Sequence, residues 1–182
     1  MSRRWIVLAA VLACTVGLAW ASLAVLGDEA SIVDSPLVGK PVPSVELEDL
    51  GSGDLVRLTA PGQVVVINFW APWCVPCKAE HELLNRLAPE WADDVRIVGV
   101  AYQSDPTEVV TFLDRVGRAV PALLDSDGRA SIEFGVYGVP ETFVVDGKGR
   151  ITYKHVGPLS PRSIEEKILP AVRDAAGTAP GN

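Results

Sequence analysis

The chain has 182 residues, of which 48% are hydrophobic and 21% are charged. This composition fits one folded domain of ordinary size and excludes a disordered chain. The net charge of −7 excludes nucleic-acid binding through the phosphate backbone, which needs a basic surface. Three cysteines and two histidines are too few for a disulfide-dense scaffold or for a metal site rich in those ligands.

The amino-terminal segment is apolar. Residues 5–26 carry no charge and follow Arg3 and Arg4. A helix of this length measures about 33 Å, enough to cross a bilayer core, and the two arginines favour a cytoplasmic amino terminus. We therefore predict that residues 1–27 form a signal anchor that crosses the inner membrane once. The rest of the chain would lie on the periplasmic side, where thiols tend to pair.

Two other interpretations of this segment fit less well. Ala19-Trp20-Ala21 resembles a signal-peptide cleavage site, but the apolar run continues to Leu26 and exceeds the usual core of about 7–15 residues. A lipoprotein signal ending at Cys14 is rejected because the residues after Cys14 stay apolar. We therefore interpret Cys14 as a small residue of a membrane helix.

The remainder of the chain is predicted to be a tether, a domain and a short end. Residues 28–43 contain Ser, Asp, Pro and Gly without periodicity, which is typical of a tether. Residues 44–176 carry strand and helix patterns and are predicted to form the folded domain. Residues 177–182 are expected to fray.

The elements of this domain alternate between strands and helices. Continuous apolar runs such as residues 64–67 are typical of buried parallel strands, and helices show apolar residues three and four apart. The alternation predicts an α/β domain with a mixed central sheet and helices on both faces. Pro170 lies within the predicted last helix, residues 161–176, and should kink it.

In chain order we expect a hairpin (45–48, 55–58), strand 63–70, helix 75–91, strand 95–101, helix 107–116, strand 122–124, a helical turn (131–134), a hairpin (142–146, 150–155) and helix 161–176.

The strongest chemical signal is the pair Cys74 and Cys77, with Val75-Pro76 between them. It lies where a buried strand is predicted to end and a helix to begin. Two cysteines across the first helical turn can form a disulfide. The helix dipole and free N–H groups at that end favour the thiolate of Cys74, while Cys77 should be shielded. We infer that Cys74 attacks a partner disulfide and that Cys77 resolves the mixed disulfide.

Other uses of the two cysteines fit less well. A purely structural disulfide would close almost no loop and so stabilise little. A zinc site needs two more ligands, and only Cys14, His81 and His155 remain; we expect the two histidines to pack or to face solvent. A peroxidase would carry a hydroxyl residue nearby, whereas Ala71 and Pro72 precede the motif. No metal site is predicted.

Residues 66–82 resemble the active-site stretch of the thioredoxin superfamily. Residues 135–143, Gly-Val-Tyr-Gly-Val-Pro-Glu-Thr-Phe, are close to the signature of its CcmG (DsbE) group. That group belongs to a membrane-anchored, extracytoplasmic branch that includes TlpA and ResA. Lys-Ala-Glu-His after the second cysteine and residues 155–161 resemble the same group. The resemblance covers about residues 36–170, nearly the whole predicted outward domain.

The resemblance implies a thioredoxin fold with an extra amino-terminal β-hairpin and a central insert. It also implies a disulfide reductase that keeps apocytochrome c, or a partner thiol protein, reduced during cytochrome c maturation. A membrane electron donor of the CcdA/DsbD type would re-reduce it. No cofactor is implied besides the redox-active disulfide.

Three residues near residue 140 acquire roles from the resemblance. Pro140 is implied to be cis, which would turn the backbone of Val139 outward to pair with an extended substrate strand. The alternative is an ordinary turn proline. Glu141 is implied to lie near the active site, where its carboxylate would disfavour the Cys74 thiolate. The alternative is a solvated glutamate at the start of a strand.

The resemblance also bears on residues around the motif. Asn68 stands where thioredoxin has a buried aspartate, so that proton acceptor is absent. Glu80, three residues beyond Cys77 on the same helix, is a candidate for moving the Cys77 proton, or else a surface residue. Trp73 should flank the disulfide and shape the docking surface, with Tyr137 as a further candidate for the groove.

The dipeptide between the cysteines departs from the group's pattern. The group often places proline first, whereas here Val75 precedes Pro76, as in thioredoxin and other reducing relatives. The dipeptide adjusts thiolate stability and hence the reduction potential. This departure agrees with a reductase and bears on which partner is preferred.

Two competing functions remain from the sequence. The first is an extracytoplasmic oxidase that introduces disulfides into secreted proteins, because the outward location is oxidising. The second, more remote, is a copper metallochaperone that uses Cys74, Cys77 and a histidine.

Overall fold

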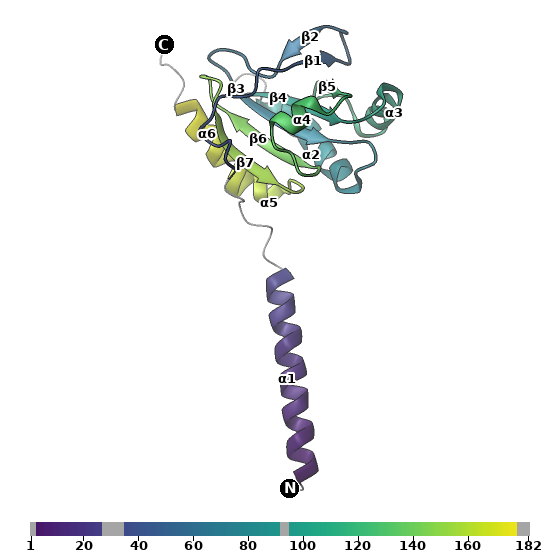
Figure 1. Ribbon diagram of the computed structural model, residues 1–182, viewed down its shortest axis with the longest axis vertical. Coiled ribbons are helices and arrows are strands. Elements are labelled where there is room, and N and C mark those ends of the chain that lie inside the picture. The colour runs from purple at the N-terminus through teal and green to yellow at the C-terminus, as the bar shows by residue number, and fades with distance from the viewer. Residues whose placement is uncertain (1–2, 27–34, 92–94, 178–182) are drawn as a thin grey trace. The chain divides into compact units, whose positions relative to one another are not determined.

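The structure is a computed structural model that describes residues 3–26, 35–91 and 95–177 (Figure 1). Helix α1 (Arg3–Leu26) and the domain that follows form two separate compact units. By length and composition, α1 is long and apolar enough to cross a membrane. The first part of the predicted tether, up to residue 34, and the predicted C-terminal end from residue 178 lie outside the described residues.

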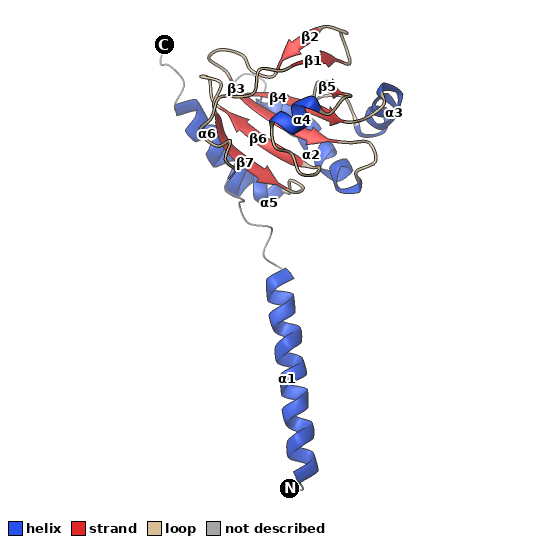
Figure 2. Cartoon of the chain, in the orientation of Figure 1, coloured by secondary structure: helices blue, strands red, loops and turns tan. Residues whose placement is uncertain are grey.

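A seven-stranded mixed sheet forms the centre of the domain (Figure 2). Its strands are β1 (Glu46–Asp49), β2 (Leu55–Arg57), β3 (Val64–Trp70), β4 (Val95–Tyr102), β5 (Ala122–Asp125), β6 (Glu141–Val145) and β7 (Ile151–Val156). Their spatial order is β2-β1-β5-β4-β3-β6-β7. Strands β3, β4 and β5 are parallel, and the remaining pairs are antiparallel. The prediction of a mixed sheet with two hairpins is confirmed.

Helices cover both faces of this sheet, as predicted. Helix α4 (Arg129–Glu133) packs on one face. Every second apolar side chain of β3 points to this face, and the others point to the opposite face. Helices α2 (Val75–Trp91) and α3 (Pro106–Val116) pack on the opposite face, together with the C-terminal helices (Figure 1). All seven residues of β3 are buried, because a strand covered on both faces has no solvent side.

The C-terminal helix differs from the single α-helix that we predicted. It consists of α5 (Pro161–Ser163), a π-helical turn η1 (Ile164–Ile168) and α6 (Leu169–Gly177). The N–H of Leu169 bonds to the carbonyl of Ile164, five residues back. Proline lacks an N–H group and clashes with the preceding turn of a regular helix. The expected distortion at Pro170 therefore takes the form of a widened turn directly before it.

Part of the predicted tether belongs to the domain. The N–H of Gly39 bonds to the carbonyl of Ile151 at 2.7 Å, and the N–H of Val42 bonds to that of Gly149 at 2.8 Å. Pro41 forms an isolated bridge with Arg150. Residues 39–42 thus pair with the β6–β7 hairpin, which satisfies their backbone groups. A pairing partner more than a hundred residues away has no local signal, so the tether prediction was too long at this end.

Close packing under the active-site strand depends on Gly99. This residue lies beside Asn68 in the parallel pairing of β3 with β4. A Cβ atom at position 99 would lie 2.6 Å from Nε1 of Trp70, whose side chain is fully buried. A bulky ring enclosed in a close-packed core has little room to move. Only glycine fits this position without displacing the Trp70 indole.

We therefore expect Gly99→Ala to destabilise the domain by about 1–3 kcal/mol, the usual cost of overpacking a core. Denaturant unfolding followed by tryptophan fluorescence measures this free energy. Gly177→Ala is the matched control, because a Cβ at position 177 meets nothing within 4 Å. Equal stability of the two variants would contradict the steric argument.

Candidate functional site

The two cysteines of the motif form a disulfide at the junction of β3 and α2. Their Cα atoms are 5.3 Å apart, and α2 begins at Val75. The N–H of Cys77 donates a hydrogen bond to Sγ of Cys74 at 3.2 Å. The residue Cys77 is 1% exposed and Cys74 is 5% exposed. The predicted order holds: Cys74 lies at the helix terminus, where N–H groups favour a thiolate, and Cys77 is the more enclosed.

A loop from a distant part of the chain lies against this disulfide. The peptide bond between Val139 and Pro140 is cis, as the resemblance implied. The carbonyl oxygen of Val139 lies 3.6 Å from Sγ of Cys74. Strand β6 begins directly after Pro140 and pairs with β3 from Phe69 onward. This antiparallel pairing brings residues 139 and 74 together across the edge of the sheet.

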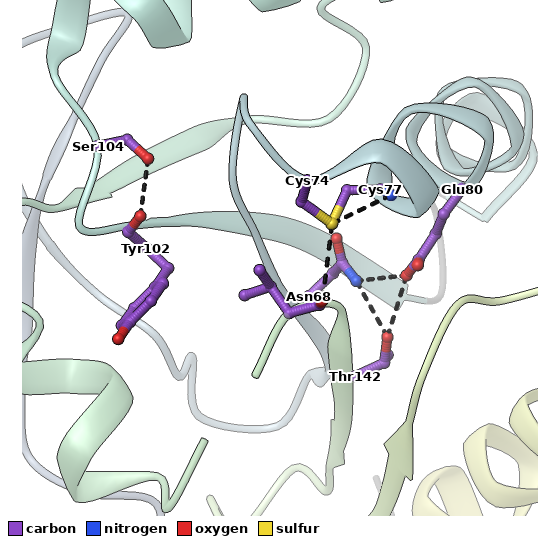
Figure 3. The surroundings of a disulfide bond; sticks show 8 residues. Asn68, Cys74, Cys77, Glu80, Tyr102, Ser104 and Thr142 are labelled. Carbon is purple, nitrogen blue, oxygen red and sulfur yellow. Dashed lines mark hydrogen bonds between the residues drawn. A yellow bond between two sulfur atoms is a disulfide. The ribbon is translucent and has the colours of Figure 1, made fainter. Parts of the chain in front are cut away.

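A polar cluster is buried beneath the disulfide (Figure 3). Oε1 of Glu80 accepts a hydrogen bond from Nδ2 of Asn68 at 2.6 Å. The same amide group lies 3.1 Å from Oγ1 of Thr142. Glu80 is 1% exposed, so it is not a surface residue. At this position thioredoxin has an acidic proton acceptor, whereas Asn68 offers an amide donor. That amide group holds the Glu80 carboxyl through the hydrogen bond.

Burial controls the acidity of Glu80. It raises the pKa of Glu80 from 4.5 to about 7, and hydrogen bonds from the Leu159 backbone, Asn68 and Thr142 oppose the rise. A carboxyl group with a pKa near neutral can both accept and release a proton in that pH range. The candidate proton carrier of the sequence analysis is therefore buried on the same helix as Cys77, one turn further along.

Glu141 is also buried, but on the opposite face of the sheet. Thr142, its neighbour in β6, contacts Glu80, and successive side chains of a strand point to opposite faces. Oε2 of Glu141 lies 2.8 Å from Nζ of Lys154, and Oε1 accepts the N–H of Tyr137 at 3.1 Å. A solvated glutamate is thus the wrong alternative for Glu141. Because Lys154 offsets its charge, any direct effect of Glu141 on the Cys74 thiolate is smaller than expected for an unpaired carboxylate.

The residues next to the two cysteines in the chain are exposed, and so is Tyr137 of the loop that faces the disulfide. Trp73 is 60% exposed, and Val75 and Tyr137 are each 84% exposed. Pro76 is exposed as well. The ring of Trp73 meets that of Tyr102 edge-on, with centroids 6.4 Å apart. Large exposed apolar side chains around a reactive group are typical of a docking surface.

Trp73 also borders an open groove toward α3. The groove has a volume of about 320 Å³, and its lining includes Pro72, Phe112 and Arg115. The ring of Trp73 contacts Tyr102 and borders this groove, and its predicted place beside the disulfide stays a prediction. The groove itself could not be foreseen, because α3 is separated from the motif by a whole strand.

The buried histidine next to Glu80 packs as an aromatic ring. The centroid of His81 lies 4.8 Å from that of Trp70 and 5.5 Å from that of Phe112. Burial lowers the pKa of His81 to about 4, so the ring is neutral at pH 7. Within the described residues, no group of three or more His, Cys, Asp or Glu side chains is arranged to hold a metal ion.

Two residues of this region were missed in the sequence. Thr142 meets Asn68 because the two are opposite each other in the β3–β6 register, and antiparallel register cannot be inferred from one sequence. Lys154 gave a usable signal. It is a lysine within a predicted strand of a hairpin, and a buried lysine must have a partner.

Known proteins agree with this site. The family model described as Redoxin matches residues 37–172. The thiol:disulfide interchange protein DsbE of Yersinia pestis is 40% identical over 157 residues, covering 84% of this chain and 82% of that protein. DsbE of Escherichia coli K12 is 41% identical over 148 residues, covering 79% and 78%.

The fold agrees with a solved structure as well. A crystal structure of a secreted Mycobacterium tuberculosis disulfide oxidoreductase homologous to E. coli DsbE superposes with a TM-score of 0.59 at 25% identity. The match covers 71% of this chain and 94% of that chain. The chain therefore belongs to the redoxin family, as a thiol–disulfide oxidoreductase of the DsbE (CcmG) type with a thioredoxin fold.

Proposed function

We propose that this oxidoreductase is an extracytoplasmic reductase that keeps apocytochrome c, or a partner thiol protein, reduced during cytochrome c maturation. One observation carries the proposal. The Cys74–Cys77 disulfide faces the carbonyl of Val139 within residues 135–143, the segment that resembles the CcmG signature. The N-terminal helix α1 would anchor the chain in the inner membrane, with the domain on the periplasmic side.

The proposed reaction transfers two electrons from the protein to a substrate disulfide. The Cys74 thiolate attacks one substrate sulfur, which forms a mixed disulfide and releases the other substrate sulfur as a thiol after it takes a proton. The Cys77 sulfur then attacks Cys74. This second step closes the Cys74–Cys77 disulfide and releases the second substrate thiol. A membrane thiol donor of the CcdA/DsbD type would run both steps in reverse to restore the two protein thiols, so no other cofactor is needed.

Backbone contacts at Val139 support a polypeptide substrate. Its carbonyl faces the Cys74 sulfur at 3.6 Å, and an extended segment bound beside it gains main-chain hydrogen bonds irrespective of side chains. The exposed rings of Trp73 and Tyr137 provide apolar contacts around that segment. A substrate cysteine in an extended chain would thereby be held near Cys74.

Glu80 is proposed to take the proton of Cys77 in the second step. Both groups are buried on α2, where water does not reach the Cys77 thiol directly. Only the ionised carboxylate can accept a proton, and the pKa of Glu80 is about 7. The resolving step should therefore accelerate as the pH rises through 7.

The direction of electron flow predicts the reduction potential of the Cys74–Cys77 pair. A reductant should have a value of roughly −200 mV or lower, toward that of thioredoxin. Equilibration with glutathione buffers, followed by tryptophan fluorescence, measures it. A value near about −120 mV, typical of a strong periplasmic oxidant, would instead assign the protein to disulfide formation.

Cells that lack this gene should lose their c-type cytochromes, because the haem-binding cysteines would remain oxidised. Haem staining of membrane and periplasmic fractions measures the loss. The wild-type gene should restore staining and Cys74→Ser should not. Cys14→Ser is the matched control and should restore it fully, because Cys14 lies in α1, a separate unit from the domain. Normal cytochromes in the deletion strain would refute the proposal.

Glu80→Gln should remove a pH dependence of stability. The raised pKa means that the folded state retains a proton that the unfolded state loses, so the contribution of Glu80 to stability is greatest below pH 4.5 and falls until about pH 7. The loss amounts to about 3 kcal/mol in the wild type. The glutamine variant lacks this contribution, so its stability relative to the wild type should rise by about 3 kcal/mol between pH 4.5 and pH 7. The lowered pKa of His81 acts in the opposite direction in both proteins and cancels in this comparison. Urea unfolding at several pH values checks this, and parallel profiles for the two proteins would contradict the assignment.

A further inference from the structure

A lysine is buried in β7, on the sheet face opposite α2. The side chain of Lys154 is 3% exposed and that of its ion-pair partner Glu141 is 1% exposed. Lys154 stands opposite Phe143 in the β6–β7 register, so Glu141 is its diagonal neighbour, within reach of a long side chain. A buried charge is costly unless its partners satisfy it. The contacts of this ammonium group therefore indicate what it holds in place.

The ammonium group and its partner both bond to the loop before β6. Nζ of Lys154 donates a hydrogen bond to the carbonyl of Gly135 at 2.8 Å. Oε1 of Glu141 accepts the N–H of Tyr137 at 3.1 Å. The Tyr137 and Phe143 rings each lie with their centroids 5.1 Å from Nζ, in the range of a cation–π contact. The ion pair thus fixes the beginning of residues 135–140 at two backbone positions.

The end of the same loop is the part that faces the disulfide. The carbonyl of Pro140 accepts the N–H of Gly157 at 3.0 Å. Between these anchors, the carbonyl of Val139 is presented to Sγ of Cys74. Lys154 contacts neither sulfur in the structure. It reaches the reacting region only through the loop.

We propose that Lys154 is a positioning residue for exchange with polypeptide disulfides. Its ammonium group holds residues 135–140 in the one arrangement in which the backbone of Val139 can pair with an extended substrate beside Cys74. An apolar pair would fill the same space with similar stability. It would provide neither the directed hydrogen bond to the Gly135 carbonyl nor the ion pair with Glu141, which together fix the loop in register.

The proposal separates two kinds of substrate. A small aromatic disulfide needs access to Cys74 but no backbone pairing. A polypeptide disulfide needs both. Loss of Lys154 should therefore slow exchange with a polypeptide and leave exchange with the small molecule almost unchanged, whereas a purely structural role would affect both equally.

The test uses the reduced full-length chain in detergent. A Cys14→Ser background leaves Cys74 and Cys77 as the reacting thiols. The rates with 5,5′-dithiobis(2-nitrobenzoate) and with insulin are compared for Lys154→Met, which retains the apolar stem, and Lys154→Arg, which retains the charge. Lys148→Met is the matched control, because Lys148 is exposed in the turn of the same hairpin.

With insulin, Lys154→Met should react about tenfold or more slowly, since a misplacement of about 1 Å in a reacting segment costs up to about a hundredfold. Its rate with the small disulfide should stay within about twofold of the wild type, because that reaction needs no pairing with Val139. Lys154→Arg should recover most of the insulin rate, and Lys148→Met should match the wild type. An unchanged insulin rate in Lys154→Met, or equal losses with both reagents, would overturn the proposal.

A double variant keeps the test decisive if Lys154→Met does not fold. Lys154→Met with Glu141→Gln leaves no unpaired buried charge, and the glutamine oxygen can still accept the N–H of Tyr137. Continued slow exchange with insulin would support positioning by the ammonium group. Recovery of the wild-type insulin rate would show that Lys154 only neutralises Glu141, and would overturn the proposal.

Discussion

The pairing of β6 with β3 is the constraint on which the site depends. It sets Thr142 opposite Asn68 and starts β6 directly after Pro140, so the carbonyl of Val139 comes within 3.6 Å of the Cys74 sulfur. The disulfide and the backbone that faces it are separated by more than sixty residues in the chain. A shift of this register by one residue would turn Thr142 away from Glu80 and move the loop off the disulfide.

Two buried glutamates near this pairing are accommodated in opposite ways. Glu80 is held by neutral donors, and burial raises its pKa to about 7. Glu141 is held by the ammonium group of Lys154 at 2.8 Å. The first group can exchange a proton near neutral pH and suits chemistry at Cys77. The second forms directed bonds across a loop, which suits the placement of a polypeptide rather than proton transfer.

Local patterns in the sequence predicted most of the elements. The sequence predicts the ends of β3 and α2 to within one or two residues. Burial on both faces gives β3 a continuous apolar run, and burial of one stripe gives α2 apolar residues at helical spacing, so neighbouring residues carry both signals. The predictions failed where the partner is distant. Residues 39–42 pair with the β6–β7 hairpin, more than a hundred residues away. That pairing has no pattern that a short window can show, whereas Pro170 did indicate locally that the last helix is distorted.

The sequence by itself determined the reactive pair, its place at the start of a helix and the alternating α/β order, since these follow from neighbours a few residues apart. The resemblance of residues 135–143 added the cis bond before Pro140. Only the tertiary structure decided that Glu80 is buried beside Asn68 and that Glu141 is paired with Lys154. The reason is physical: burial and charge pairing depend on strand register and on which face of the sheet a side chain occupies, and both are set by contacts between segments far apart in the chain.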